Sequence, residues 1–202
     1  VLENANRLLV VGAFCIGTNQ IDLPATSDLG AVVFNAPYSN TRSVVELAIG
    51  EIITLMRRIP YFNQEMHSGK WTKSAKGSYE VRGKKLGIVG YGNIGSQLSV
   101  IAEALGMDVY YYDLVEKLAL GNATKVDSLE ELLAKVDILT LHVDGRAENE
   151  GFIGEKEIAM MKPGSLLLNL SRGKVVDIPA LAAALKSGHL RGASVDVYPA
   201  EP

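Results

Sequence analysis

The most informative stretch of this sequence is KKLGIVGYGNIGSQLSVIAEALG, residues 84–106. An apolar run leads into three glycines, Gly90, Gly92 and Gly95, and a segment of helical character follows them. This G-x-G-x-x-G order is typical of a strand, a tight turn and a helix whose free amide groups face an anion. The first glycine permits the turn, the second lets backbone approach a pyrophosphate, and the third lets helix and strand pack closely. The stretch therefore predicts a dinucleotide site, with a glycine-rich turn that serves only packing as the alternative.

Asp113 supports the dinucleotide interpretation. It ends the next predicted strand, about 20 residues after the glycines, where a carboxylate can hydrogen-bond ribose hydroxyls. The carboxylate favours NAD over NADP because it would repel the additional phosphate of NADP. A turn-forming aspartate is the alternative, because Asp is common after strands.

The rest of the chain shows an alternation of strand and helix patterns. Strands are predicted near residues 85–89, 108–112, 137–142, 165–170 and 193–197, with a weaker one near 124–126. Helical stretches separate them, and alternation of this kind predicts an α/β fold with a Rossmann-type, doubly wound parallel sheet. Two helices are well marked: Ser128 and Glu131 form a capping box, while Pro179 and Gly188 bracket a later helix.

The first 60 residues predict a separate βαβ unit followed by a long helix. Residues 8–12 and 31–35 read as strands, residues 23–29 as a short helix that ends before Gly30. The long helix covers residues 41–58, and Pro60 is expected to stop it.

A second motif is LLLNLSRGK, residues 166–174. Its leucines predict a strand buried on both faces, and Arg172 follows the end of that strand. Ligands of open α/β sheets bind beyond the carboxyl ends of the strands, so this guanidinium could meet an anionic substrate. A solvated surface arginine is the alternative.

Composition excludes several classes of protein. The 202 residues are 48% hydrophobic, and 20 Lys and Arg against 23 Asp and Glu give a net charge of −3, so nucleic acid is not an expected partner. No apolar run is long enough to span a membrane, so no membrane partner is expected, and no metal site is predicted. The single cysteine, Cys15, suits a reducing compartment, and a cytoplasmic location is expected.

The chain resembles the D-2-hydroxyacid dehydrogenase family, most of all its D-3-phosphoglycerate dehydrogenases. The resemblance rests on FCIGTNQIDL (14–23), NAPYSNTRSVVELAIGE (35–51), the glycine motif, MKPGSLLLNLSRGKVVDIPAL (161–181) and GASVDVYPAEP (192–202). It implies an NAD-dependent oxidation of D-3-phosphoglycerate in serine biosynthesis. It also implies two incomplete domains: residues 1–37 from a flavodoxin-like substrate domain, and residues 38–202 from the NAD-binding Rossmann domain.

The resemblance implies a role for each matching residue. Arg172 would grip the substrate carboxylate and polarise its C2 oxygen, and Glu201 would hydrogen-bond the catalytic histidine. Asp196 would receive the nicotinamide carboxamide. The whole cofactor-binding set would be Gly90, Gly92, Asn93, Ile94, Gly95, Asp113, His142, Val143, Ser171 and Asp196, and the substrate-binding set Ile16, Gly17, Asn40 and Arg172.

Two departures from the family accompany these assignments. Asp144 and Gly145 stand where many relatives have proline, which puts the contacts of that loop in doubt. The family's histidine base would come after Pro202, so this chain alone is expected to bind NAD and hardly turn over.

Alternative functions remain open. One is a glyoxylate or hydroxypyruvate reductase of the same family, and another is a non-enzymatic NAD-sensing corepressor on the same fold. The resemblance also implies a homo-oligomer, a dimer or tetramer, formed through the cofactor domain.

Overall fold

The computed structural model describes residues 2–5, 7–18 and 20–200, and the chain forms two compact units, Val1–Ser43 and Val44–Pro202. The division falls in the first turn of helix α2 (Thr41–Arg57), a few residues after the domain boundary expected from the resemblance. The assignment of these units as substrate and cofactor domains stays a prediction.

The first unit is a βαβ element preceded by a short 3-10 turn, Leu2–Asn4. Strands β1 (Val10–Ala13) and β2 (Val32–Asn35) pair in parallel, with helix α1 (Leu23–Asp28) between them in sequence. The Asp22 carboxylate accepts a hydrogen bond from the Ala25 amide at 3.0 Å and so begins α1. The predicted βαβ unit is confirmed, with strand bounds that differ by one or two residues.

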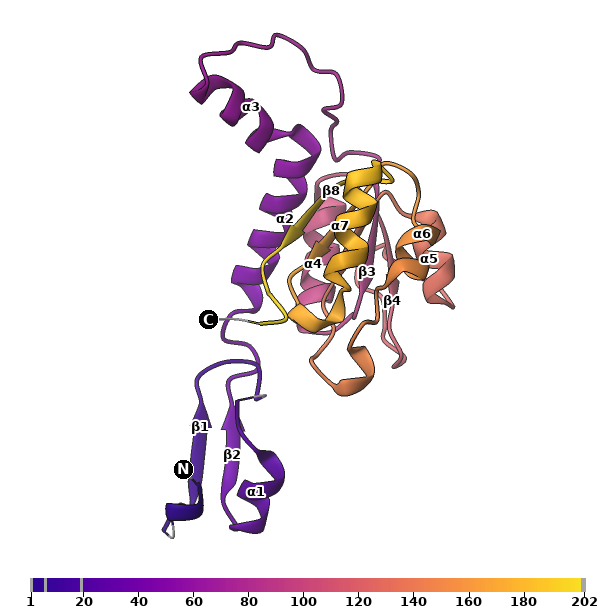
Figure 1. The fold of residues 1–202 in the computed structure, drawn as a ribbon. Coiled ribbons are helices and arrows are strands. Elements are labelled where there is room, and N and C mark those ends of the chain that lie inside the picture. Colours follow the sequence, from indigo (N-terminus) through magenta and orange to yellow (C-terminus); the bar gives the residue numbers. More distant parts are fainter. Residues whose placement is uncertain (1, 6, 19, 201–202) are drawn as a thin grey trace. The chain divides into compact units, whose positions relative to one another are not determined.

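The second unit contains, in its described residues, a six-stranded parallel sheet (Figure 1). The strand order is β5-β4-β3-β6-β7-β8. Counted within the unit, this is the 3-2-1-4-5-6 order of the Rossmann fold, which confirms the predicted fold class. The strands are β3 (Lys85–Val89), β4 (Asp108–Tyr112), β5 (Thr124–Lys125), β6 (Ile138–Leu141), β7 (Ser165–Asn169) and β8 (Leu190–Val195).

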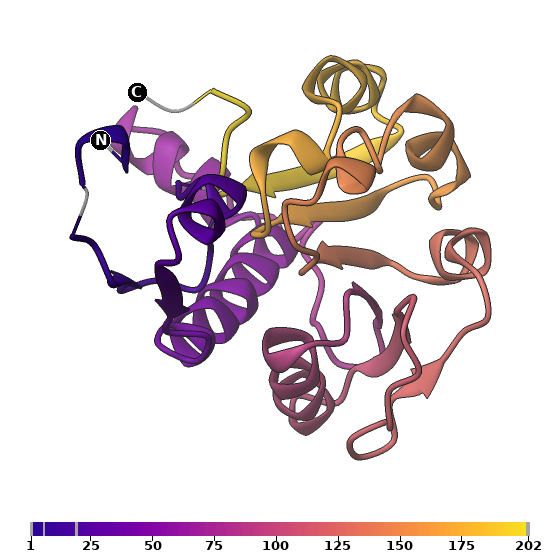
Figure 2. The same ribbon diagram turned by 90° about the horizontal axis from the view of Figure 1, so that it is seen from below.

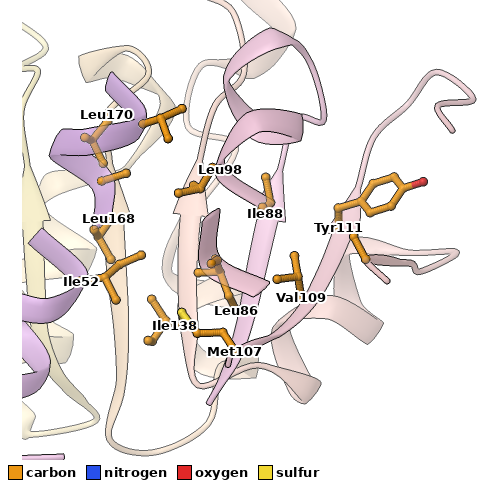
Figure 3. Packing of buried hydrophobic residues seen from close by; sticks show 14 of the residues in the cluster. Ile52, Leu86, Ile88, Leu98, Met107, Val109, Tyr111, Ile138, Leu168 and Leu170 are labelled. Carbon is orange, nitrogen blue, oxygen red and sulfur yellow. The ribbon is translucent and has the colours of Figure 1, made fainter. Parts of the chain in front are cut away.

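Helices cover both faces of this sheet (Figures 1 and 2). Helices α2 and α4 (Asn93–Ala104) pack on one face, and α5 (Leu129–Lys135), α6 (Glu155–Met160) and α7 (Ile178–Ser187) pack on the other. Figure 3 shows side chains of α2, α4 and the strands meeting in the first of these two cores, with Ile52, Leu98 and Leu86 among them. Every residue of β6 and β7 is buried, as the leucine run of β7 predicts, because helices lie above and below them.

The predicted helix ends are confirmed for α5 and α7. Ser128 accepts a hydrogen bond from the Glu131 amide at 3.1 Å, and Asp177 does the same for the Ala180 amide at 3.0 Å. Gly188 closes α7 with a left-handed backbone, φ 78°. The Glu131 carboxylate accepts from the amide of Asp127 rather than from that of Ser128, so the reciprocal bond of the capping box reaches one residue further back.

The end of the long helix is confirmed to within one residue, but the role of Pro60 and the start of the last strand were predicted wrongly. Helix α2 ends at Arg57, Arg58 adopts a left-handed conformation, and Pro60 lies in the first turn of a further helix, α3 (Ile59–His67). Proline suits that first turn because its missing N–H would have no partner there, so it begins a helix instead of stopping one. Strand β8 starts at Leu190 rather than near residue 193, because the charged Arg191 interrupts the apolar pattern that marks a strand.

Asp137 joins three elements at the amino-terminal edge of the sheet. One carboxylate oxygen accepts from the Lys85 amide at 2.9 Å, and the other accepts from the Lys162 ammonium at 3.1 Å. Burial alone would raise the pKa of Asp137, but these two partners together hold it below the ordinary value. The charge of Asp137 therefore contributes to stability at neutral pH.

Among the residues that the structure describes, none of the helices combines the length and the apolar character needed to cross a membrane.

Candidate cofactor and substrate site

The glycine turn connects β3 to α4 at the carboxyl ends of the strands. It lies beside the boundary between β3 and β6, where the strand order of the sheet reverses. Gly90 has φ 92°, and a Cβ atom there would lie 2.6 Å from the carbonyl oxygen of His142 at the end of β6. Both the backbone conformation and this close approach require glycine. The turn is therefore fixed at the topological switch point, where dinucleotides bind in Rossmann folds.

Gly92 and Gly95 differ in their surroundings. A Cβ atom at Gly95 would lie 2.3 Å from the carbonyl oxygen of Gly90, so this glycine allows α4 to pack on the turn. A Cβ atom at Gly92 would have no protein atom within 4 Å. Gly92 is the N-cap of α4, with no side chain to occupy the free amide groups of the first turn, which includes Asn93 and Ile94. This open position with free donors fits a pyrophosphate.

Asp113 follows β4, and both of its carboxylate oxygens are held by backbone amides. Oδ2 accepts from Tyr91 at 2.7 Å, and Oδ1 accepts from Val115 at 2.8 Å. The first bond ties the carboxylate directly to the residue between Gly90 and Gly92. Because each oxygen has a further lone pair, the fixed carboxylate can still accept from ribose hydroxyls beside the glycine turn.

His142 and Val143 follow β6 and lie against the same turn. The His142 amide donates to Val89 at 2.8 Å, and the ring nitrogen Nε2 lies 3.0 Å from Thr140 Oγ1. Burial lowers the pKa of His142 to about 4, so the ring is neutral at physiological pH. Its Nδ1 is buried without a hydrogen-bond partner in the described structure. A neutral, partly buried ring fits a wall of the site and not a group that exchanges protons at neutral pH.

Arg172 follows β7, beyond Ser171, and is half-buried. Its Nη1 donates to the carbonyl oxygen of Ser171 at 2.7 Å, and its Cγ would lie 3.1 Å from a Cβ atom placed on Gly145. In the described part of the chain no ion pair of Arg172 is present, so the guanidinium keeps donors for an anion.

The segment after β8 runs over the β7 turn. Asp196 is exposed, and its amide donates to the carbonyl oxygen of Asn169 at 3.1 Å. A Cβ atom on Gly173 would lie 1.9 Å from the carbonyl carbon of Tyr198, so glycine is needed where these two segments cross. Glu201, the predicted partner of a catalytic histidine, lies outside the described residues.

The predicted substrate residues of the first unit lie after its two strands. The Ile16 carbonyl oxygen accepts from Asn35 Nδ2 at 2.7 Å, and the Gly17 carbonyl oxygen accepts from the Cys15 thiol at 3.1 Å. Asn40 is exposed in the turn before α2. These bonds fix the shape of the Ile16–Gly17 loop within its own unit.

The second unit thus gathers the glycine turn, Asp113, His142, Val143, Ser171, Arg172 and Asp196 at the carboxyl ends of its strands. Their roles in binding stay predictions. Sequence reasoning missed two residues that shape this edge, Asn169 and Gly173, and noted a third, Gly145, only as a departure from the family. The signal for Asn169 was a lone amide inside a leucine run, while the two close approaches at the glycines depend on contacts that no local pattern reveals.

Comparison with known proteins agrees with this geometry. Residues 49–202 match the model of a family described as D-isomer specific 2-hydroxyacid dehydrogenase, NAD binding domain. Over its whole length the chain is 59% identical to a D-3-phosphoglycerate dehydrogenase of Haemophilus influenzae, and it covers 49% of that protein. The chain therefore spans about half the length of that curated relative.

Solved structures give the same result. A D-lactate dehydrogenase from Aquifex aeolicus, complexed with NAD and lactic acid, is 31% identical with a TM-score of 0.88, over 96% of this chain and 59% of its own. A glyoxylate reductase from Paecilomyes thermophila is 30% identical with a TM-score of 0.89, over 98% and 60% of the two chains. The chain belongs to the D-isomer specific 2-hydroxyacid dehydrogenases and carries their NAD-binding domain.

Proposed function

We propose that the protein containing this chain oxidises D-3-phosphoglycerate to 3-phosphohydroxypyruvate with NAD, in serine biosynthesis. The observation that carries the proposal is the position of Arg172 at the same sheet edge as the glycine turn and Asp113. A guanidinium that can bind an anion, next to a turn that can bind a dinucleotide at the same edge of the sheet, suits a reaction between an acid and a nicotinamide. The choice among acids rests on the 59% identity to an enzyme named for D-3-phosphoglycerate.

The chain's residues would bind and orient the two reactants. NAD, when bound, accepts the hydride that leaves C2 of the acid. Arg172 would hold the carboxylate in a bidentate pair and donate to the C2 oxygen as it becomes a carbonyl oxygen. The resemblance assigns removal of the hydroxyl proton to a histidine after Glu201, and Glu201 would orient that base.

The rest of the site would fix the position of the cofactor. The amides at the start of α4 would bind the pyrophosphate, and Asp113, which two amides hold, would accept from the ribose hydroxyls. The resemblance gives Asp196 the nicotinamide carboxamide, and gives Ile16, Gly17 and Asn40 contacts with the acid and its phosphate. The protein's part in catalysis would be to hold C2 of the acid against the nicotinamide carbon that accepts the hydride, and to exclude water.

The test is NADH formation by the chain together with its natural flanking sequence. D-3-phosphoglycerate is compared with D-glycerate and with D-lactate. We expect turnover of the phosphorylated acid and little of the other two. Equal or faster turnover of D-glycerate would favour a hydroxypyruvate reductase. Absence of turnover despite NADH binding would favour a binding protein.

Arg172→Lys gives a second test, because lysine keeps the charge and loses the planar pair of donors. We expect kcat/KM for the acid to fall by about 10²–10³-fold. Lys174→Ala is the matched control, because Lys174 is an exposed cation two residues away whose only described ion pair is with the exposed Glu150. Equal activity of the Arg172→Lys variant and the control would contradict the role of Arg172.

The proposal includes a cytoplasmic location, which the single cysteine supports, and a homo-oligomer formed through the cofactor domain. Light scattering of the purified protein at several concentrations tests the second point. A monomer at every concentration would contradict it.

A further inference from the structure

Asn169 is the last residue of β7, and its side chain is fully buried, at 0% exposure. Both ends of its amide have partners. Oδ1 accepts from the amide and the hydroxyl of Ser171, at 3.1 and 2.8 Å, and Nδ2 donates to the carbonyl oxygen of Arg172 at 3.0 Å. A buried amide costs little when it is satisfied in this way, and these bonds set the course of the backbone from Asn169 to Arg172.

The main chain of Asn169 makes a second connection. Its carbonyl oxygen accepts from the Asp196 amide at 3.1 Å, at the end of the neighbouring strand β8. One residue therefore contacts both of the segments that carry Arg172 and Asp196. The resemblance assigns the first of these to the acid and the second to the nicotinamide.

The direction of the Arg172 side chain depends on the same turn. Its guanidinium donates to the carbonyl oxygen of Ser171, and the amide and hydroxyl of the same Ser171 donate to Asn169. The stem of Arg172 lies over Gly145, where a Cβ atom would be within 3.1 Å of Cγ. The guanidinium is thus placed by a backbone turn beneath it and a glycine beside it. A shift of that turn would move the guanidinium with it.

We propose that Asn169 is a positioning residue for hydride transfer, which acts through its side chain on Arg172 and through its carbonyl group on Asp196. It touches neither reactant. It keeps the residue for the acid and the residue for the nicotinamide in register across two adjacent strands. The proposal rests on the function proposed above, because it takes the roles of Arg172 and Asp196 from there.

Asn169→Ala removes all three side-chain hydrogen bonds, and Asn169→Asp keeps an acceptor for Ser171 while it places an oxygen against the Arg172 carbonyl group. Both variants are made in the chain with its natural flanking sequence. Ser165→Ala is the matched control, because Ser165 is also buried in β7, at its far end, and its hydroxyl has no described hydrogen-bond partner. Circular dichroism and the melting temperature establish which variants fold, and either Asn169 variant is sufficient for the test.

The measurements are kcat and KM for D-3-phosphoglycerate, and the Kd for NADH. We expect kcat/KM to fall by about 10²-fold in each folded Asn169 variant, because a displacement of about 1 Å at the reacting groups has that effect. The Kd for NADH should stay within about threefold, since both variants keep the main-chain carbonyl group of Asn169 that accepts from the Asp196 amide. Ser165→Ala should match the wild type. A purely structural role of Asn169 would instead lower the melting temperature and leave kcat/KM of the folded protein unchanged, which would overturn the proposal.

A double-mutant cycle with Arg172→Lys separates action through Arg172 from a general disturbance. If Asn169 acts through Arg172, then Asn169→Ala should lower kcat/KM by a much smaller factor in the Arg172→Lys background than in the wild type. Equal costs in both backgrounds would overturn that route. Wild-type protein that turns over no D-2-hydroxy acid would overturn the proposed function and this assignment together, whereas active wild type with fully active Asn169 variants would overturn only the assignment.

Discussion

Variants of Gly92 and Gly95 allow the binding of the cofactor to the glycine turn to be tested separately from the stability of the fold. Alanine at Gly92 would enter open space, so the stability cost is that of a poorer N-cap, about 0.5–1 kcal/mol. The same methyl group would occupy the position where the pyrophosphate approaches the backbone. Relief of such an overlap costs about 1–3 kcal/mol, so we expect the Kd for NADH to rise by about 10–100-fold.

Alanine at Gly95 should instead lower the stability of the fold. Its methyl group would lie 2.3 Å from the Gly90 carbonyl oxygen, and backbone must move to accommodate it. A clash with backbone belongs at the upper end of the overpacking range, about 2–3 kcal/mol, which exceeds the gain in helix propensity of up to about 1 kcal/mol. We therefore expect a net loss of about 1–2 kcal/mol, which corresponds to a fall in melting temperature of roughly 2–8 °C for a protein of this size.

Urea unfolding followed by circular dichroism gives the stabilities, and quenching or enhancement of NADH fluorescence gives the affinities. Gly50→Ala is the control, because Gly50 is exposed within α2 with no atom near its Cβ position, and alanine there should only stabilise the helix. A stable Gly92→Ala variant that binds NADH as tightly as the wild type would contradict the binding of the pyrophosphate at Gly92. An unchanged stability of Gly95→Ala would refute the packing argument.

Three further predictions concern charge and positioning. The pKa of His142 is about 4 in the folded protein against about 6.5 unfolded, so the unfolded chain binds more protons between these values. Up to about 3 kcal/mol of stability is therefore lost as the pH falls through this window. His142→Gln should flatten that part of the pH profile of urea unfolding, and an unchanged profile would show that the ring is not buried as described. The pKa of Asp137 is also lowered, so its contribution is present at neutral pH and is lost only on acidification below about pH 4. Because its side chain is 35% exposed and solvent screens its charge, Asp137→Asn should lower the free energy of unfolding at pH 7 by only about 1 kcal/mol, and a variant as stable as the wild type would contradict the role of this carboxylate. Gly145→Ala should press on the stem of Arg172 and lower kcat/KM for the acid by about tenfold with the Kd for NADH unchanged, and a loss of NADH affinity alone would show that the loop serves the cofactor.

The sequence predicts most of the fold because its signals are local. The apolar run before Arg172, the capping pattern at Ser128 and Glu131, and the Pro179 and Gly188 pair each specify an element within a few residues. One error occurs where a charge interrupts a pattern, and the other occurs where a proline fits the first turn of a helix as well as its end. Arg191 hid the start of β8, and Pro60 was taken as the end of a helix when it begins the next one.

The site is predicted less completely because it depends on contacts between elements. The glycine motif and Asp113 were found from spacing, and the Tyr91 amide links them as that spacing requires. The close approach of His142 to Gly90, and the bond between Asn169 and Asp196, join residues from different strands. Such contacts are set by strand order, which no short stretch of sequence contains.

The reaction proposed for the protein that contains this chain is hydride transfer from C2 of D-3-phosphoglycerate to NAD. The most direct measurement uses the acid deuterated at C2, with the chain and its natural flanking sequence, followed by mass spectrometry of the NADH formed. We predict that the NADH carries the deuterium and that its formation slows in the Arg172→Lys variant. Unlabelled NADH, or no NADH at all from this acid, would contradict the account.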